Sequence, residues 1–264
     1  MSNTFSQASN FTSAMRGTVD RRTGQFRAML QIENILANRM KGPSVPFGFR
    51  YAPFNEIDYG FGRGWSLIWS SYDSDNKLLL PSDGTVLKIA PKTTDGVQTI
   101  VQGPLEKVIF SRLGTQAYSV THAEGNVDIL KGSSYGYSVK VPERIFSKAG
   151  HSVRLTWDEP DVSHHRLTGF YDDDGRQILA VDYGNALAPV ITLWPGSGES
   201  LVIRLGLTVR SGVSYLTSIA CGTDYEWTLG YDYSLSSTLA PLNAISHAGG
   251  LIETAVYQKE GFQL

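Results

Sequence analysis

The 264-residue chain has a single cysteine, Cys221, so it can form neither an internal disulfide nor a four-cysteine zinc site. It also lacks an excess of either charge, because 23 Lys and Arg residues stand against 25 Asp and Glu residues, for a net charge of -2. Nucleic-acid binders and polybasic membrane binders carry a strong positive balance, so this composition excludes them as classes. No run comes near the roughly 18 consecutive apolar residues that a transmembrane helix needs, so a membrane span is also excluded.

Helical periodicity is scarce as well. The best candidate, residues 28–40, alternates in a way that reads equally as a strand. From about residue 43 the chain consists of short Val, Ile, Tyr and Trp runs separated by Gly, Pro, Asn and Asp, which is typical of strands joined by tight turns. With 27 glycines and 13 tyrosines in addition, the sequence predicts an all-β fold.

A repeat of about 25 residues occupies the second half of the chain. Its turn glycines are separated by 25, 25, 23, 24 and 28 residues, and they are Gly125, Gly150, Gly175, Gly198, Gly222 and Gly250. An alternating apolar segment follows each glycine, so each unit reads as a β-hairpin whose turn needs the positive φ that glycine tolerates. A lone hairpin cannot bury its apolar face, and we therefore expect the hairpins to stack into a continuous curved antiparallel sheet.

One of these turns carries the sequence Tyr171-Asp172-Asp173-Asp174-Gly175-Arg176. It resembles the tyrosine-aspartate (YD) repeat of the Rhs family, whose units have a YDxxGR core between apolar strands. Upstream, residues 19–26 and the segment 58–67, which ends in Gly-Arg-Gly-Trp-Ser-Leu, look like the opening of the repeat region in Rhs proteins and in the C components of bacterial insecticidal toxin complexes. The resemblance covers roughly residues 17 to 260.

In that family the repeats wind a β-sheet into a hollow shell around a toxic carboxy-terminal segment. The resemblance therefore implies a non-catalytic structural segment of a shell that encloses or delivers a toxin, with no cofactor. About six repeats are too few to close a large shell, so we expect either a longer shell protein or a sheet completed by another chain. The expected partners are toxin cargo, the rest of the shell or a second copy.

The predicted domains are a flexible tail (1–16), an opening β segment (17–115) and about six degenerate hairpin repeats (116–264). We expect structural roles for the six turn glycines and for Tyr171, Asp172 and Arg176. The first 15 residues are polar and lack the basic-then-apolar order of a secretory signal. The resemblance thus implies synthesis in the bacterial cytoplasm and, for any export, a route without a classical signal peptide.

Two alternatives remain open. Trp65, Trp69 and Trp194 are candidates to stack on sugar rings, as in a carbohydrate- or receptor-binding β module, although aromatic residues also stabilise sheets through cross-strand pairs. The pair His164-His165 follows Glu159, which allows a metal site or a hydrolase, although the surrounding polar residues read as a loop between strands.

The remaining chemistry is sparse. The aspartates before Gly175 lack the glutamate that ends a calcium loop, and Cys221 has no base nearby in the sequence to activate it. We therefore expect no metal and no enzymatic activity.

Overall fold

The computed structural model describes residues 15–19, 26–53, 55, 58–90, 94–103, 108–132, 138–159, 165–223, 225–234, 240–247, 249–250 and 252–257. Every regular element in these ranges is a β-strand, which confirms the predicted all-β fold. The ambiguous segment 28–40 is largely strand, since it belongs to the strand Phe26–Leu36. The predicted tail 1–16 lies outside the described residues except for its last two, which begin the first strand. The described ranges contain no long apolar helix that could span a membrane.

The first part of the chain forms a four-stranded antiparallel sheet, called here the small sheet. Its strands, in spatial order, are β1 (Met15–Val19), β2 (Phe26–Leu36), β3 (Ser44–Tyr51) and β4 (Trp65–Leu67). Along β2, buried residues such as Leu30 and Ile32 alternate with more exposed ones, as expected for a sheet with one packed face.

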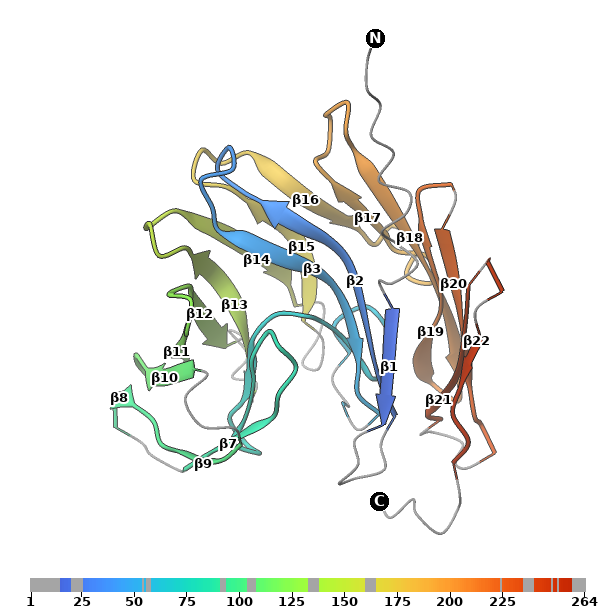
Figure 1. Cartoon of the computed structure of the whole chain (residues 1–264), viewed down its shortest axis with the longest axis horizontal. Helices are drawn as coiled ribbons and strands as arrows, with labels where there is room; N and C mark the ends of the chain where they lie inside the picture. The colour runs from blue at the N-terminus through green and yellow to red at the C-terminus, as the bar shows by residue number, and fades with distance from the viewer. Residues whose placement is uncertain are drawn as a thin grey trace.

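The remaining 18 strands form one sheet, called here the large sheet. They are β5 (Ser71–Asp73), β6 (Leu78–Leu80), β7 (Leu87–Ile89), β8 (Gly96–Val97), β9 (Ile100–Gln102), β10 (Val108–Arg112), β11 (Ala117–His122), β12 (Val127–Gly132), β13 (Val139–Phe146), β14 (Ser152–Asp158), β15 (Arg166–Tyr171), β16 (Gln177–Asp182), β17 (Val190–Leu193), β18 (Leu201–Arg210), β19 (Val213–Cys221), β20 (Tyr225–Tyr231), β21 (Leu242–His247) and β22 (Ile252–Thr254). From β10 to β22 each strand pairs antiparallel with the next, while β5 joins at the start of β13 and β8 joins β10. Figure 1 shows this sheet bending as an arch from the green strands through yellow to red.

The repeat glycines lie in the turns that follow β11, β13, β15, β17, β19 and β21. Because the strands run antiparallel in chain order, all six turns lie at the same end of the strands, along one side of the large sheet. Four of these turns share one hydrogen bond, in which the glycine N–H donates to the carbonyl three residues earlier, and the glycines are Gly125, Gly150, Gly175 and Gly250. This is the three-residue hairpin loop with a left-handed glycine, and Gly175 has a φ of +76°.

One repeat turn differs from the prediction. In the loop after β17 the positive φ angles fall on Trp194, at +48°, and on Gly196, at +77°, and not on Gly198. The loop from Leu193 to Leu201 is longer than the other glycine turns, so the tight bend comes two residues before the aligned glycine. The period of the repeat is kept, but the position that requires glycine is Gly196 and not Gly198.

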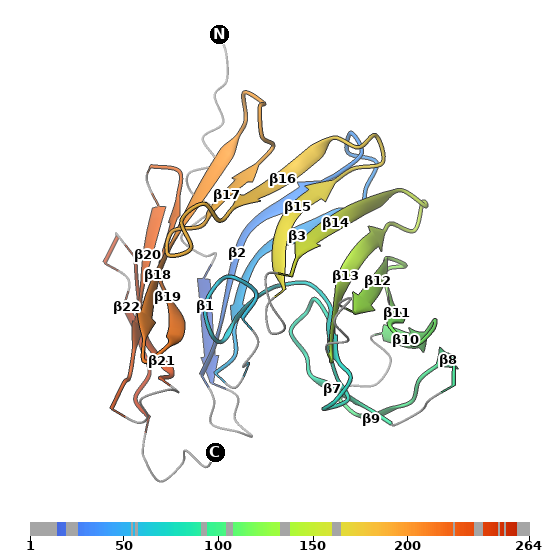
Figure 2. The same ribbon diagram turned by 180° about the vertical axis from the view of Figure 1, so that it is seen from behind.

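Two hydrophobic cores stabilise the arrangement. The main core lies between the small sheet and one face of β13–β21, where the Trp69 ring stacks on Phe170 at a centroid distance of 5.7 Å. In the same core, Trp65 Nε1 donates to the Tyr231 hydroxyl over 2.9 Å. A second core forms among β5–β7 and β10–β12. The view from behind in Figure 2 again shows the blue strands against the middle of the arch, so the small sheet covers this face of the large sheet.

The segment ending in Gly-Arg-Gly-Trp joins the two sheets. Asp58 Oδ1 accepts the N–H of Gly62 over 3.1 Å, and the next residue, Arg63, donates its N–H to Ser214 O of β19 over 2.8 Å. Gly62 has a φ of +81°, and a Cβ at this position would lie 2.7 Å from the backbone nitrogen of Leu216. Only glycine allows the loop to approach β19 this closely.

Candidate functional site

A groove of about 760 Å³ lies between the tip of the β2–β3 hairpin and two repeat turns of the large sheet. Its lining comes from the hairpin tip (residues 36–40), from the β15–β16 turn and from the β17–β18 loop. The lining residues of the turn and the loop are Asp172, Asp174, Arg176, Ile178, Trp194, Ser197, Gly198 and Glu199. This volume falls within the range of about 300–1,000 Å³ that is usual for small-molecule sites. The groove is therefore large enough to receive a ligand.

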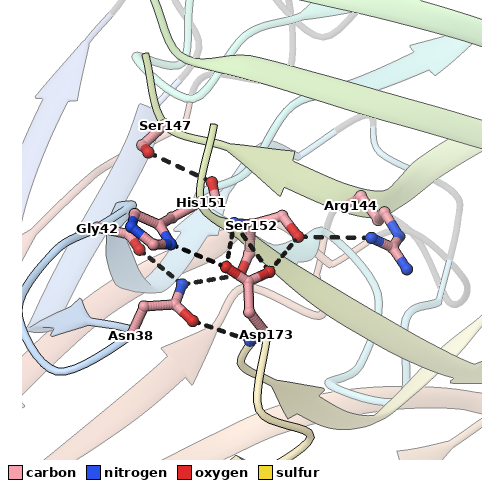
Figure 3. A network of polar contacts seen from close by, with 7 residues as sticks. All are labelled: Asn38, Gly42, Arg144, Ser147, His151, Ser152 and Asp173. Atoms are coloured by element: carbon pink, nitrogen blue, oxygen red, sulfur yellow. Dashed lines mark hydrogen bonds and ion pairs between the residues drawn. The ribbon is translucent and has the colours of Figure 1, made fainter. Parts of the chain in front are cut away.

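The hairpin tip is held in place by Asn38, which is almost fully buried. Its side-chain nitrogen donates to Gly42 O over 2.7 Å and to Ser152 O over 2.9 Å, and its side-chain oxygen accepts the Asp173 N–H over 2.8 Å. Figure 3 shows these bonds converging from three separate loops. A single amide side chain thus ties the small sheet to two neighbouring repeat turns.

The Asp173 carboxylate completes this network. It accepts the Ser152 hydroxyl over 2.8 Å, the Ser152 N–H over 3.2 Å, and His151 Nδ1 over 3.1 Å. Burial acts to raise the pKa of Asp173, but the hydrogen bonds from Ser152 and His151 outweigh it and lower that pKa. We call Asn38, His151, Ser152 and Asp173 the clasp.

The clasp holds a strained segment. Asn38, Arg39 and Met40 have φ angles of +54°, +53° and +68°, and none of them is glycine. Such angles are costly for residues with a Cβ and persist only where surrounding contacts impose them. The strained turn leaves Met40 exposed and brings the exposed Arg39 guanidinium within 3.9 Å of the Asp174 carboxylate.

Several residues singled out in the sequence meet at the groove. Asp172, Arg176, Trp194 and Gly198 all line it, although they come from two different repeat units. Asp172 also closes its own turn, because its Oδ1 accepts the Arg176 N–H over 2.8 Å. Tyr171, the last residue of β15, is not part of this lining. The Arg154 guanidinium lies over the Tyr171 ring, with the guanidinium carbon 4.7 Å from the ring centroid.

Two of the proposed stacking residues have a different role. Trp65 and Trp69 are 0% and 3% exposed, and their ring N–H groups bond to Tyr231 and to Pro46 O. The prediction that these two rings face a ligand is therefore wrong, because both rings are buried in the main core. Trp194 alone of the three lines the groove.

The histidine hypothesis finds little support in the geometry. His164 lies outside the described residues, and His165 is 2% exposed with its Nδ1 3.7 Å from Glu159 Oε1. Burial lowers the pKa of His165, which favours the neutral ring. In the described part of the chain, no three His, Cys, Asp or Glu residues are grouped to hold a metal ion. Cys221 is buried, and burial raises the pKa of its thiol to about 11.

A buried Ser70, His122 and Asp128 cluster escaped the sequence analysis. Ser70 precedes β5, whereas the other two residues flank the first repeat glycine. His122 Nε2 lies 2.9 Å from Asp128 Oδ2, and the Ser70 hydroxyl donates to that same oxygen. The Ser70 hydroxyl oxygen also lies 3.4 Å from His122 Nε2, the same ring nitrogen that meets Asp128. In a serine nucleophile relay the imidazole stands between the serine and the carboxylate and contacts each with a different nitrogen, so this arrangement is not such a relay.

The sequence signal for the clasp was also missed. Asn38 stands 135 residues before Asp173, and an asparagine in a hairpin tip is ordinarily read as a turn residue only. The three aspartates before Gly175 marked the turn, but nothing in their spacing distinguished Asp173 as the one that binds another loop.

A scan of protein-family models and a search of curated proteins each return no match. Among solved structures, the chain is similar to TcdB2-TccC3-TEV, with 14% identity and a TM-score of 0.47 over 96% of this chain and 16% of that one. It is similar to the Photorhabdus luminescens Tc holotoxin pore, with 14% identity and a TM-score of 0.43 over 91% of this chain and 16% of that one.

A third likeness is to the N-terminal domain of the effector protein SpvB from Salmonella typhimurium strain LT2, with 13% identity and a TM-score of 0.40 over 83% of this chain and 98% of that one. The chain spans about a sixth of the length of the toxin-complex chains it matches. These scores are too low to assign a family.

Proposed function

We propose that this chain is a non-catalytic structural segment of an Rhs-like shell that encloses or delivers a toxin. The observation that carries the proposal is the unbroken antiparallel pairing from β10 to β22, with the repeat turns together at one end of the strands. Together with the YD-like turn at 171–176, this is the arrangement expected of a wall built from stacked hairpins. Such a wall acts mechanically, because continuous backbone hydrogen bonding leaves no gap for water or a protease.

The covered face of the large sheet refines the proposal. The small sheet packs on β13–β21, so cargo has no access to that stretch of the wall. A segment whose concave side is already filled suits the closed end of a container better than its middle. We therefore propose that this chain contributes a filled end and that the cavity for cargo lies elsewhere in the assembly.

Strand β22 offers a place for the wall to continue. Within the described residues its only register partner is β21, and the Ala255 N–H just after it donates to Asn243 O over 2.9 Å. Since successive N–H groups of a strand point to opposite sides, the Thr254 N–H faces away from β21. Exposed strand edges pair readily with strands of other chains. The proposed partner is thus another protein chain, either the rest of the shell, its cargo or a second copy.

The proposal also includes synthesis in the bacterial cytoplasm and any export by a route without a classical signal peptide. It includes no cofactor and no catalytic residue.

The test is size-exclusion chromatography with light scattering on the purified chain, alone and mixed with the product of the adjacent reading frame. We expect a multimer or a complex. Thr254→Pro removes one outward N–H and leaves the β21 pairing intact, so it should abolish assembly while the circular dichroism spectrum stays unchanged. Thr254→Val keeps the N–H and should assemble normally. A wild-type chain that stays monomeric in both samples contradicts the proposal, and assembly by Thr254→Pro places the contact at another edge.

A further inference from the structure

A buried arginine lies where the small sheet meets the first strands of the large sheet. Arg50, on β3, is only 8% exposed, and its Nε donates to Ser66 Oγ over 3.2 Å. Its Nη1 donates to Pro81 O over 2.9 Å, and its Nη2 donates to Trp69 O over 2.8 Å. A guanidinium has five N–H groups, so these bonds leave one N–H on each terminal nitrogen in the described structure.

The charge of Arg50 is costly in this position. All three oxygens that it bonds in the described structure are neutral. Burial lowers the pKa of its guanidinium to about 10, and the charge of Asp83 only partly offsets this effect, so the group is still protonated at neutral pH. Because a buried charge is costly unless an opposite charge accompanies it, the surroundings of Arg50 favour a negatively charged occupant.

A cavity of about 20 Å³ adjoins the guanidinium. Its polar lining comes from Arg50, Tyr59, Ser66, Ser70 and Ser71, and the rest of the lining is mainly apolar. A water molecule needs about 10–15 Å³, so the cavity has room for one particle of about the size of a water molecule or a chloride ion. Sulfate and phosphate, which carry four oxygens each, are too large for it.

The lining offers hydrogens to an occupant more than it offers lone pairs. Two backbone carbonyls beside the guanidinium already accept from it, and Ser66 Oγ accepts from Nε but keeps its own O–H to donate. The Ser71 side chain is hydrogen-bonded to the Tyr59 hydroxyl, which uses one of their two hydroxyl hydrogens and leaves the other. An occupant that only accepts hydrogen bonds suits this lining better than water, which also has to donate.

We infer that this cavity binds one small monovalent anion of the size of chloride, held by Arg50, by Ser66 and by the Ser71–Tyr59 pair. The anion balances the single buried positive charge and accepts the hydrogens that the protein leaves over. On the other side, Ser70 donates to Asp128, and His122 Nε2 lies 2.9 Å from that carboxylate, so a protonated His122 offsets its negative charge. The bound anion would stabilise the junction between the two sheets.

The experiment measures chloride binding to the full chain by the broadening of the chloride NMR signal, with bromide as the competitor. We expect the chain to broaden the signal and bromide to narrow it again. In parallel, the melting temperature is recorded from about 1 to about 200 mM NaCl, with sodium gluconate keeping the ionic strength constant. The melting temperature should rise as chloride replaces gluconate, because gluconate is too large for the cavity and only an ion that binds the folded chain shifts the equilibrium.

Three variants locate the site. Arg50→Gln removes the charge and should weaken chloride binding at least about tenfold, and Ser66→Ala keeps the charge but removes one donor, so it should weaken binding about threefold. Ser66→Ala decides the matter if Arg50→Gln does not fold. Arg112→Gln is the matched control, because Arg112 lies outside the lining and pairs with Asp95, and it should bind chloride as the wild type does.

Three results would overturn the inference. The first is a chloride signal that is no broader with the chain than without it. The second is a melting temperature that does not change when chloride replaces gluconate. The third is chloride binding of wild-type strength in every folded variant of Arg50 and Ser66. The inference does not depend on the shell proposal, because chloride binding can be measured whether or not the chain assembles.

Discussion

Replacing Asn38 with alanine tests whether the clasp holds the small sheet to the large one. The substitution removes three hydrogen bonds, of 2.7, 2.9 and 2.8 Å, that join residues from three loops. It leaves the hairpin tip without the side chain that spans from Gly42 to Asp173. It also places alanine at a φ of +54°, where asparagine is tolerated better.

The expected loss of stability follows from these contacts. Each hydrogen bond contributes about 1 kcal/mol net, so the three together account for about 3 kcal/mol. The backbone strain adds up to about 1 kcal/mol. For a chain of this size each kcal/mol corresponds to about 2–4 °C, so the melting temperature should fall by about 10 °C.

Urea denaturation, followed in parallel by tryptophan fluorescence and circular dichroism, measures the change. Asn38→Gly separates the two contributions, since glycine loses the bonds but accepts the positive φ, and it should be less damaging than alanine by about 1 kcal/mol. Asn34→Ala is the matched control on the same hairpin, because its bond to Gln31 is exposed and should contribute less than about 0.5 kcal/mol. If Asn38→Ala and Asn34→Ala differ by less than about 1 kcal/mol, the clasp does not stabilise the fold.

Two other predictions concern the repeat turns. Gly175 has a φ of +76° with no atom near the position of a Cβ, so Gly175→Ala should cost about 1–2 kcal/mol from backbone strain alone, whereas Gly198→Ala should cost less than about 0.5 kcal/mol; equal losses in urea melts would refute the reassigned turn. Burial acts to lower the pKa of His122, but the bond to Asp128 outweighs it and raises that pKa above 6.5, so this pair stabilises the fold fully below pH 6.5 and less as the pH rises through the raised value. The melting temperature of His122→Gln should not show this loss of stability as the pH rises. A variant whose melting temperature depends on pH in the same way as that of the wild type would contradict the prediction.

Much of the fold was readable from local patterns. Alternating apolar residues predicted strands, and the spaced glycines predicted turns, because both depend on contacts within a few residues along the chain. The shift from Gly198 to Gly196 shows the limit of such reading. Alignment by period locates a turn to within a few residues, but the backbone angles depend on the length of the individual loop.

The candidate site was readable only in fragments. Asp172, Arg176 and Trp194 each stood out by residue type, yet their sequence positions do not show that they line one groove. The tryptophans illustrate the reason. Trp65, Trp69 and Trp194 are chemically identical, and only packing decides that two are buried while the third reaches the groove.

The sequence by itself determined that this protein is all β, that its second half is a hairpin repeat, and that glycine is needed at most of the hairpin turns, because these properties follow from short-range geometry. Only the tertiary structure decided that the small sheet covers one face of the large one and that the clasp forms beside a groove. Asn38 and Asp173 are 135 residues apart, and alternation shows that a strand has two faces without showing which partner covers either one.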